Sequence, residues 1–199
     1  MSILLSGTHQ RIGLAILRCL HSGSSVDVSV EDYLYGCIQP DFSLRVLLTP
    51  HIKERSFDFV LRTISELAST PLLIDGTTRA AFATQLGVVM HFLADFFCAV
   101  HNQRQDESLP LHFAYEATLH LVSRAMPLDT LAQESLAEFK TSRTATAGDL
   151  ESHLERLHRR YLATPMSPQT DLRFALAAGT AAAYYVFSAC QRAAMQQAA

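Results

Sequence analysis

The sequence is poor in charged residues. They make up only 18% of the 199 residues, and the formal net charge is −3. A protein that holds nucleic acid by neutralising its phosphates needs a basic surface, so this composition speaks against a stable nucleic-acid partner. The share of hydrophobic residues, 49%, is too high for a disordered chain. It favours one globular domain over residues 1–199 with a sizeable core.

Paired cysteines and an export signal are also lacking. The four cysteines form no CxxC motif and lie far apart, mostly in apolar segments: Cys19, Cys37, Cys98 and Cys190. A free thiol in such surroundings behaves as a small hydrophobic group, so we expect a reducing compartment. The apolar N-terminal stretch is interrupted by Gln10, Arg11 and Arg18 and follows no basic segment. No signal peptide is evident, and we expect a cytoplasmic protein.

No segment predicts a membrane-spanning helix. The uncharged run over residues 174–190 is mostly alanine with glycine, threonine and serine. It is shorter than the ~20 strongly apolar residues that a spanning helix needs. We expect this run to form a packed helix of the core.

Hydrophobic periodicity predicts helices along most of the chain and gives few strand signals. Apolar residues recur at helical spacing, and turn residues separate the periodic segments. The predicted helices cover residues 8–20, 56–67, 78–100, 111–124, 128–139 and 148–162, followed by an alanine-rich helix capped by Thr170 or Asp171. A short helix over residues 27–35 is a further candidate. We predict an all-α fold, a single-domain bundle of six or seven helices.

The apolar stretch VMHFLADFFCAVH, residues 89–101, holds an aspartate between two histidines. An unpaired carboxylate buried there would take up a proton or cost several kcal/mol. No lysine or arginine lies within residues 80–100, so the partner of Asp95 must come from elsewhere. The alternatives are a salt bridge to a distant arginine and a metal ion. We favour the metal, because His91 lies one helical turn away on the same face.

A second pair repeats this spacing. His112 and Glu116 are also four residues apart, and nitrogen and carboxylate oxygen are ligand types that zinc accepts. His101 is six residues past Asp95, which on a continuous helix places it about 240° around the axis. Either the helix ends near residue 100, or His101 serves a second ion. We expect His21, His153 and His158, which lie in polar surroundings, to be solvated.

These motifs resemble the zinc-dependent phospholipase C family, which includes bacterial phosphatidylcholine-preferring enzymes and clostridial alpha-toxins. The resemblance rests on HxxxDxxxxxH and HxxxE, and upstream on GTH, PD and PH in the same order. The residues that carry it are His9, Asp41, His51, His91, Asp95, His101, His112 and Glu116. It implies an all-α fold with three clustered metal ions, commonly zinc, that hydrolyse a phosphodiester.

The resemblance also implies a ligand set for each ion. The ligands of one ion would be Asp41, His51, His91 and Asp95. Those of a second would be His101, His112 and Glu116. His9 would bind the third ion, with Asp95 bridging that ion to the first. Asp41, expected on a loop or at a helix start after Pro40, would also be the general base or orient the attacking water.

Two departures from the family bear on these expectations. Exported members use a processed N-terminal tryptophan as a ligand of the third ion, whereas this sequence has no tryptophan and His9 lies eight residues after Met1. We therefore expect two or three zinc ions. The secreted toxins also carry a membrane-binding domain or surface, which we expect this short chain to lack. We expect the substrate to be a soluble phosphodiester or a dispersed phospholipid headgroup.

Two other functions remain open. The related fungal-type zinc nucleases share the fold and much of the ligand pattern, so a single-strand nuclease or nucleotidase is one alternative. A non-catalytic helical protein with a structural or decayed metal site is the other. The sequence gives no indication of the oligomeric state.

Overall fold

The computed structural model describes residues 3–21, 26–42, 49–70, 76–102, 109–141 and 146–197. Within these ranges it contains helices and no strand, which confirms the all-α prediction. The helices are α1 (Ile3–His21), α2 (Val30–Gly36), α4 (Lys53–Ala68), α5 (Gly76–Phe96), α6 (Ala99–Asn102), α7 (Leu109–Ala125), α8 (Leu128–Thr141), α9 (Ala147–Leu162) and α10 (Pro168–Gln197), with a 3-10 turn η1 (Gln39–Asp41).

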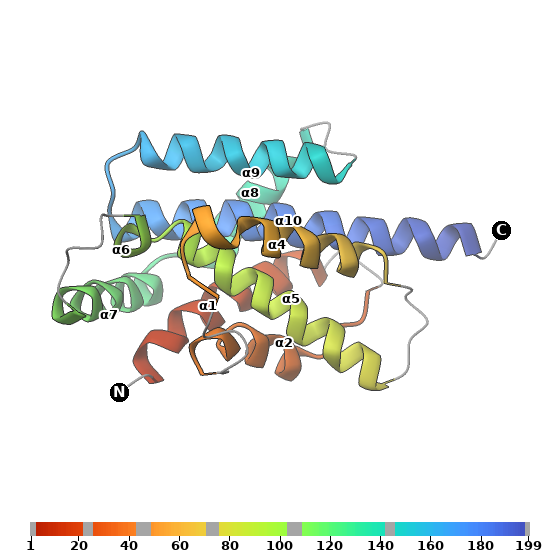
Figure 1. Cartoon of the computed structure of the whole chain (residues 1–199), viewed down its shortest axis with the longest axis horizontal. Coiled ribbons are helices and arrows are strands. Elements are labelled where there is room, and N and C mark those ends of the chain that lie inside the picture. The colour runs from red at the N-terminus through yellow and green to blue at the C-terminus, as the bar shows by residue number, and fades with distance from the viewer. Residues whose placement is uncertain are drawn as a thin grey trace.

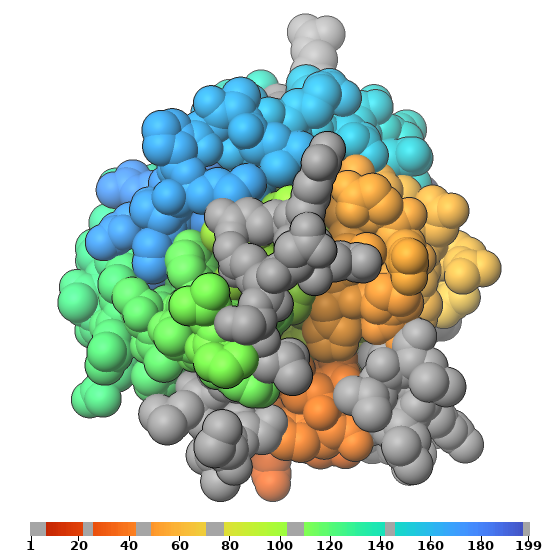
Figure 2. Space-filling view, turned by 60° about the vertical axis from the view of Figure 1, so that its left-hand side comes forward, coloured from red at the N-terminus to blue at the C-terminus, as the bar shows by residue number. Residues whose placement is uncertain are grey.

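Helix α10 organises the bundle. It runs along the length of the molecule and packs against α1, α4, α5, α7, α8 and α9 (Figure 1). Helix α5 crosses it and carries α2 on its other side. At one end of the bundle, α9 lies above α4 and α7 on the molecular surface (Figure 2). Among the described helices none is long and apolar enough to cross a membrane.

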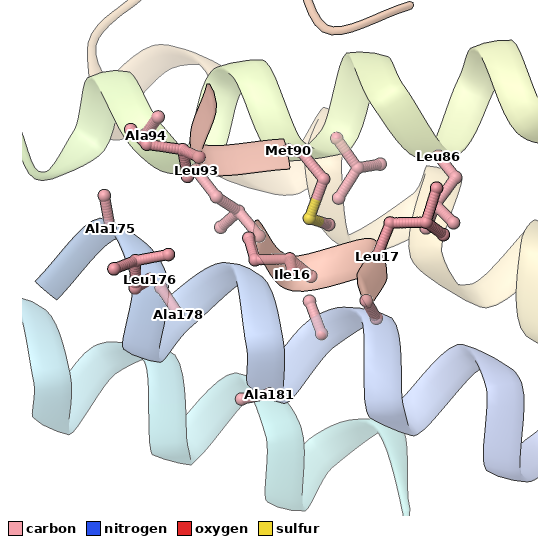
Figure 3. Close-up of a cluster of buried hydrophobic side chains, with 14 of the residues drawn as sticks. Ile16, Leu17, Leu86, Met90, Leu93, Ala94, Ala175, Leu176, Ala178 and Ala181 are labelled. Carbon is pink, nitrogen blue, oxygen red and sulfur yellow. The ribbon is translucent and has the colours of Figure 1, made fainter. Parts of the chain in front are cut away.

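The core lies where α1, α5 and α10 meet. Large aliphatic side chains of α1 and α5 pack against small residues of α10 (Figure 3). The labelled members are Ile16, Leu17, Leu86, Met90, Leu93, Ala94, Ala175, Leu176, Ala178 and Ala181. Because alanine side chains are short, the α10 backbone approaches its neighbours closely, and the uncharged run 174–190 is a packed core helix as expected. All four cysteines are buried, and they form no disulfide with one another.

Two glycines bring α2 and α5 into backbone contact. Gly87 of α5 faces Gly36 at the end of α2. A Cβ atom on Gly87 would overlap the carbonyl oxygen of Tyr33 and lie 2.7 Å from the amide nitrogen of Cys37. The approach depends on the missing side chain, and it places the Cys37 carbonyl next to His91, one turn further along α5.

The prediction of a continuous helix up to residue 100 is wrong. Helix α5 ends at Phe96, and the short helix α6 begins at Ala99. The side-chain amide of Asn102 donates hydrogen bonds to the carbonyl oxygens of Phe96, at 3.0 Å, and Cys98, at 2.8 Å. These bonds satisfy carbonyl groups that the helix end leaves without intrahelical partners. The break redirects the chain before His101.

The predicted cap of the last helix is also wrong. Helix α10 begins at Pro168, and the Ser167 hydroxyl accepts a hydrogen bond from the amide of Thr170 at 3.1 Å. Ser167 therefore holds the capping position that we expected for Thr170 or Asp171. The side chain of Asp171 is free for another role, because it points into the protein and is buried.

Candidate metal centre

The eight predicted ligands come together in space. They arrive from α1, η1, the segment before α4, α5, α6 and α7. Within the described residues they form three groups. In each group the candidate ligand atoms, one nitrogen or oxygen per residue, all lie within 4.8 Å of one another. The first is His9, His91 and Asp95, the second is Asp41, His51 and His91, and the third is His101, His112 and Glu116. The third group is the one predicted for the second ion. For the other two ions we expected Asp95 to be the shared ligand, whereas here His91 is shared and Asp95 groups with His9.

Asp95 lies at the centre of this cluster. Its Oδ2 is 2.7 Å from His51 Nδ1 and 3.1 Å from His91 Nε2. Its Oδ1 is 3.4 Å from His9 Nε2 and 3.5 Å from His101 Nε2. Burial alone would raise the pKa of this carboxyl, but the surrounding histidines lower it well below its usual range. Asp95 is thus ionised inside an apolar stretch, and histidines take the place of the arginine that we considered.

A backbone carbonyl group fixes the orientation of the His91 ring. Its Nδ1–H donates to the carbonyl oxygen of Cys37 at 2.9 Å, so Nε2 is the ring nitrogen that faces Asp95 and Asp41. A histidine that binds a metal typically donates its second ring N–H to a carbonyl or carboxylate in this way. Burial lowers the pKa of His91, but Asp95 and the other acceptors outweigh it and raise the pKa to about 9. A metal ion would compete with that proton for Nε2.

His9 is the least satisfied member of the cluster. Its ring stacks on His91 with a centroid distance of 4.0 Å. Burial, and then the neighbouring His91, lower the pKa of His9 to about 3, so the ring is neutral. Its Nδ1 is buried without a hydrogen-bond partner. Buried ring nitrogens are normally paired, so the neutral His9 ring, with an unpaired nitrogen and a buried carboxylate nearby, suits a cation better than a hydrogen-bond network.

The third group lies between α6 and α7. His112 Nε2 is 2.9 Å from Glu116 Oε1, across one turn of α7. His101 Nε2 is 3.8 Å from the same oxygen. Burial lowers the pKa of His101, so its ring is neutral and able to donate a lone pair. The end of α5 at Phe96, earlier than the end near residue 100 that we considered, brings His101 to this group.

The cluster is closed on one side and open on the other. The side chains of His91 and Asp95 are 0% and 4% exposed. Those of Asp41, His51 and His112 are 24%, 20% and 28% exposed. Solvent therefore reaches the cluster beside Asp41, His51 and His112, which are its most exposed members. Burial raises the pKa of the Asp41 carboxyl, with Asp95 adding to the rise and His91 opposing it.

Sequence reasoning missed the residues that support the cluster. His158, which we expected in solvent, is buried, and its Nε2–H donates to Asn102 Oδ1 at 3.0 Å. The polar neighbours of His158 in the sequence face outward on α9, whereas this ring faces α6. Asp171 and Tyr115 also meet beside the cluster, at 2.7 Å. No local motif marks any of these residues.

A helical fold with three adjoining groups of histidine and carboxylate donors defines a candidate zinc protein, because these are ligand types that zinc binds. The model of the zinc dependent phospholipase C family matches residues 8–167. The chain belongs to this family, as the resemblance implied, and all eight predicted ligands lie within the matched range. No curated protein and no solved structure gives a significant match to the chain.

Proposed function

We propose that this protein is a zinc-dependent hydrolase that cleaves a phosphodiester bond in the manner of a phospholipase C. The observation that carries the proposal is the convergence of eight donor side chains in three groups around Asp95. Membership of a zinc-dependent family supports it independently. We further propose that the three groups hold two or three zinc ions.

The chain supplies a preorganised donor set for these ions. Asp95 provides a buried negative charge between the groups, and the Cys37 carbonyl holds His91 in the tautomer that presents Nε2. Bound zinc would supply Lewis acidity, lowering the pKa of water and neutralising charge on a phosphate. Fixed donors of this kind need little rearrangement during the reaction, which is how preorganised sites lower a barrier.

Asp41 is our candidate for the general base. It is the carboxylate on the accessible side of the cluster that belongs to the group with His51 and His91. Its raised pKa makes the carboxylate a stronger base than an ordinary aspartate. We propose that Asp41 accepts a proton from the attacking water or orients that water toward phosphorus.

The test is hydrolysis by zinc-reconstituted protein of a panel containing a phosphorylcholine ester, a bis-aryl phosphate and short single-stranded DNA. We expect turnover of the first two. Asp41→Asn should lower kcat at least about 10²-fold, the lower range for loss of general-base catalysis. Asp58→Asn, the same change at an exposed position of α4, is the control and should leave kcat unchanged.

The other outcomes separate the alternatives. Cleavage of single-stranded DNA in preference to the phosphorylcholine ester would favour the nuclease function and overturn the phospholipase C-like specificity. No hydrolysis of any panel member by a zinc-loaded, folded preparation would overturn the enzyme proposal and leave a structural metal site.

A further inference from the structure

The break between α5 and α6 is held by a residue of α10. The backbone N–H of Ala99, the first residue of α6, donates to Asp171 Oδ2 at 2.9 Å. His101 follows two residues later on the same short helix. Asp171 therefore fixes the point from which the chain carries His101 into the third group of ligands.

The same carboxylate also holds α7. The hydroxyl of Tyr115 donates to Asp171 Oδ2 at 2.7 Å, and Tyr115 directly precedes Glu116. One oxygen atom thus ties together the two helices that supply His101 and Glu116. The other oxygen, Oδ1, accepts from the hydroxyl of Tyr161 on α9 at 2.9 Å. We call Asp171, Ala99, Tyr115 and Tyr161 the carboxylate hub.

The hub borders the metal cluster. A small cavity of about 20 Å³, room for about one water molecule, is lined by Asp171 together with His9, Asp95 and Glu116. Asp171 is 1% exposed, and the hydrogen bonds found for it come from neutral donors rather than from a lysine or arginine within the described residues. A buried carboxylate without a cation is expensive to keep, and an apolar residue would fill the same space at lower cost. Its three hydrogen bonds, two of them to the helices of the third group, give it a geometric role.

We propose that Asp171 is a positioning residue for the third group of ligands, His101, His112 and Glu116. The proposal rests on that group being a zinc site, as the proposed function requires. Asp171 lies beyond the residues matched by the family model, so the assignment comes from the contacts of the hub alone. Removing a residue that fixes the orientation of metal ligands typically lowers metal affinity by about 10- to 100-fold.

The test is a zinc titration of the full chain against a chromophoric chelator, with zinc per chain counted by mass spectrometry. Asp171→Ala removes all three hydrogen bonds, so we expect one zinc ion per chain to bind at least about tenfold more weakly. The other ions should bind as in the wild type. Asp171→Asn should restore most of the affinity, because its single carbonyl oxygen can still accept from both Ala99 and Tyr115.

A pair of tyrosine variants provides the matched control. Tyr115→Phe deletes the hydrogen bond on the side of the third group, and Tyr161→Phe deletes the one on the far oxygen. We expect Tyr115→Phe to weaken the binding of one zinc ion. Tyr161→Phe should lower the melting temperature without changing zinc affinity. This pair decides the question if circular dichroism shows that Asp171→Ala does not fold.

The outcomes keep the two proposals apart. A wild-type chain that binds no zinc would overturn the proposed function together with this inference. The second case is a wild-type chain that binds zinc. Equal zinc affinity in Asp171→Ala, or equal effects of the two tyrosine changes on zinc affinity, would then overturn only the positioning role. Selective loss of one zinc ion in Asp171→Ala or Tyr115→Phe supports it.

Discussion

The contact between α2 and α5 makes Gly87→Ala a sensitive probe of how the fold positions His91. The new Cβ would overlap the carbonyl oxygen of Tyr33 and lie 2.7 Å from the amide nitrogen of Cys37, so the two backbones must separate. Overpacking of this kind costs about 1–3 kcal/mol. Separation also weakens the 2.9 Å hydrogen bond from His91 to Cys37, worth about 0.5–1.5 kcal/mol. Alanine regains about 1 kcal/mol of helix propensity.

The net expectation is a loss of about 0.5–3.5 kcal/mol in the free energy of unfolding, measured by urea denaturation of the zinc-free chain. Gly148→Ala is the control, because Gly148 is exposed in the first turn of α9 and a Cβ there would meet only Thr146 Oγ1, at 3.9 Å. That variant should be unchanged or more stable by up to about 1 kcal/mol. Equal stability of Gly87→Ala and the wild type would refute the reasoning about the helix contact.

Two further predictions concern the buried charges. Burial raises the pKa of Asp171 above 3.8, so the folded chain keeps a proton that the unfolded chain releases, and stability falls as pH rises through that window. Asp171→Asn has no carboxyl at this position, so its stability lacks this fall. In urea denaturation at a series of acidic pH values, the wild type should lose stability relative to the variant from about pH 4 upward. A stability difference that does not change with pH would contradict this. Chelating zinc should lower the melting temperature, since free zinc at 100 times its Kd stabilises by about 2.7 kcal/mol per site; an unchanged melting temperature would speak against zinc binding to the folded state.

The pH prediction depends on the hydrogen-bond partners of Asp171 staying neutral. The titratable groups that hydrogen-bond to it or interact with its charge are Tyr115, Tyr161 and Cys98, while His9, Asp95 and Glu116 line a small cavity with it. Burial, and then Asp171 itself, raise the pKa of the two tyrosines and Cys98, so none of these three titrates at acidic pH.

The spacing of residues along the helices predicted much of the candidate site. A separation of four residues puts two side chains on one helical face, and the pairs His91–Asp95 and His112–Glu116 are indeed 3.1 Å and 2.9 Å apart. The absence of any lysine or arginine near Asp95 in the sequence pointed to partners from distant segments. His51 and His9, on other elements, are two of those partners.

The break after Phe96 was beyond reach of the sequence, because apolar residues continue without a glycine or proline through residues 97–100. Helical periodicity therefore predicts one helix. Hydrogen bonds donated by the Asn102 side chain, and one that the Ala99 N–H donates to Asp171, stabilise the break. Asp171 lies 72 residues after Ala99 in the sequence. Tertiary contacts of this kind override local propensity.

The buried His158 and Asp171 were missed for a related reason. Each lies in a polar or capping context in the sequence, which predicts a surface position. In the fold both side chains are buried by helices that pack over them. His158 donates a hydrogen bond to Asn102, and Asp171 accepts one from Tyr161. A buried polar residue with satisfied hydrogen bonds leaves no periodic signal in the chain.

The zinc content of the purified chain tests the central claim most directly. The measurement is inductively coupled plasma mass spectrometry on untagged protein, reconstituted with zinc and dialysed against metal-free buffer. The three groups around Asp95 predict two or three zinc ions per chain. Less than one zinc ion per folded chain would contradict the metal centre and the hydrolase function that depends on it.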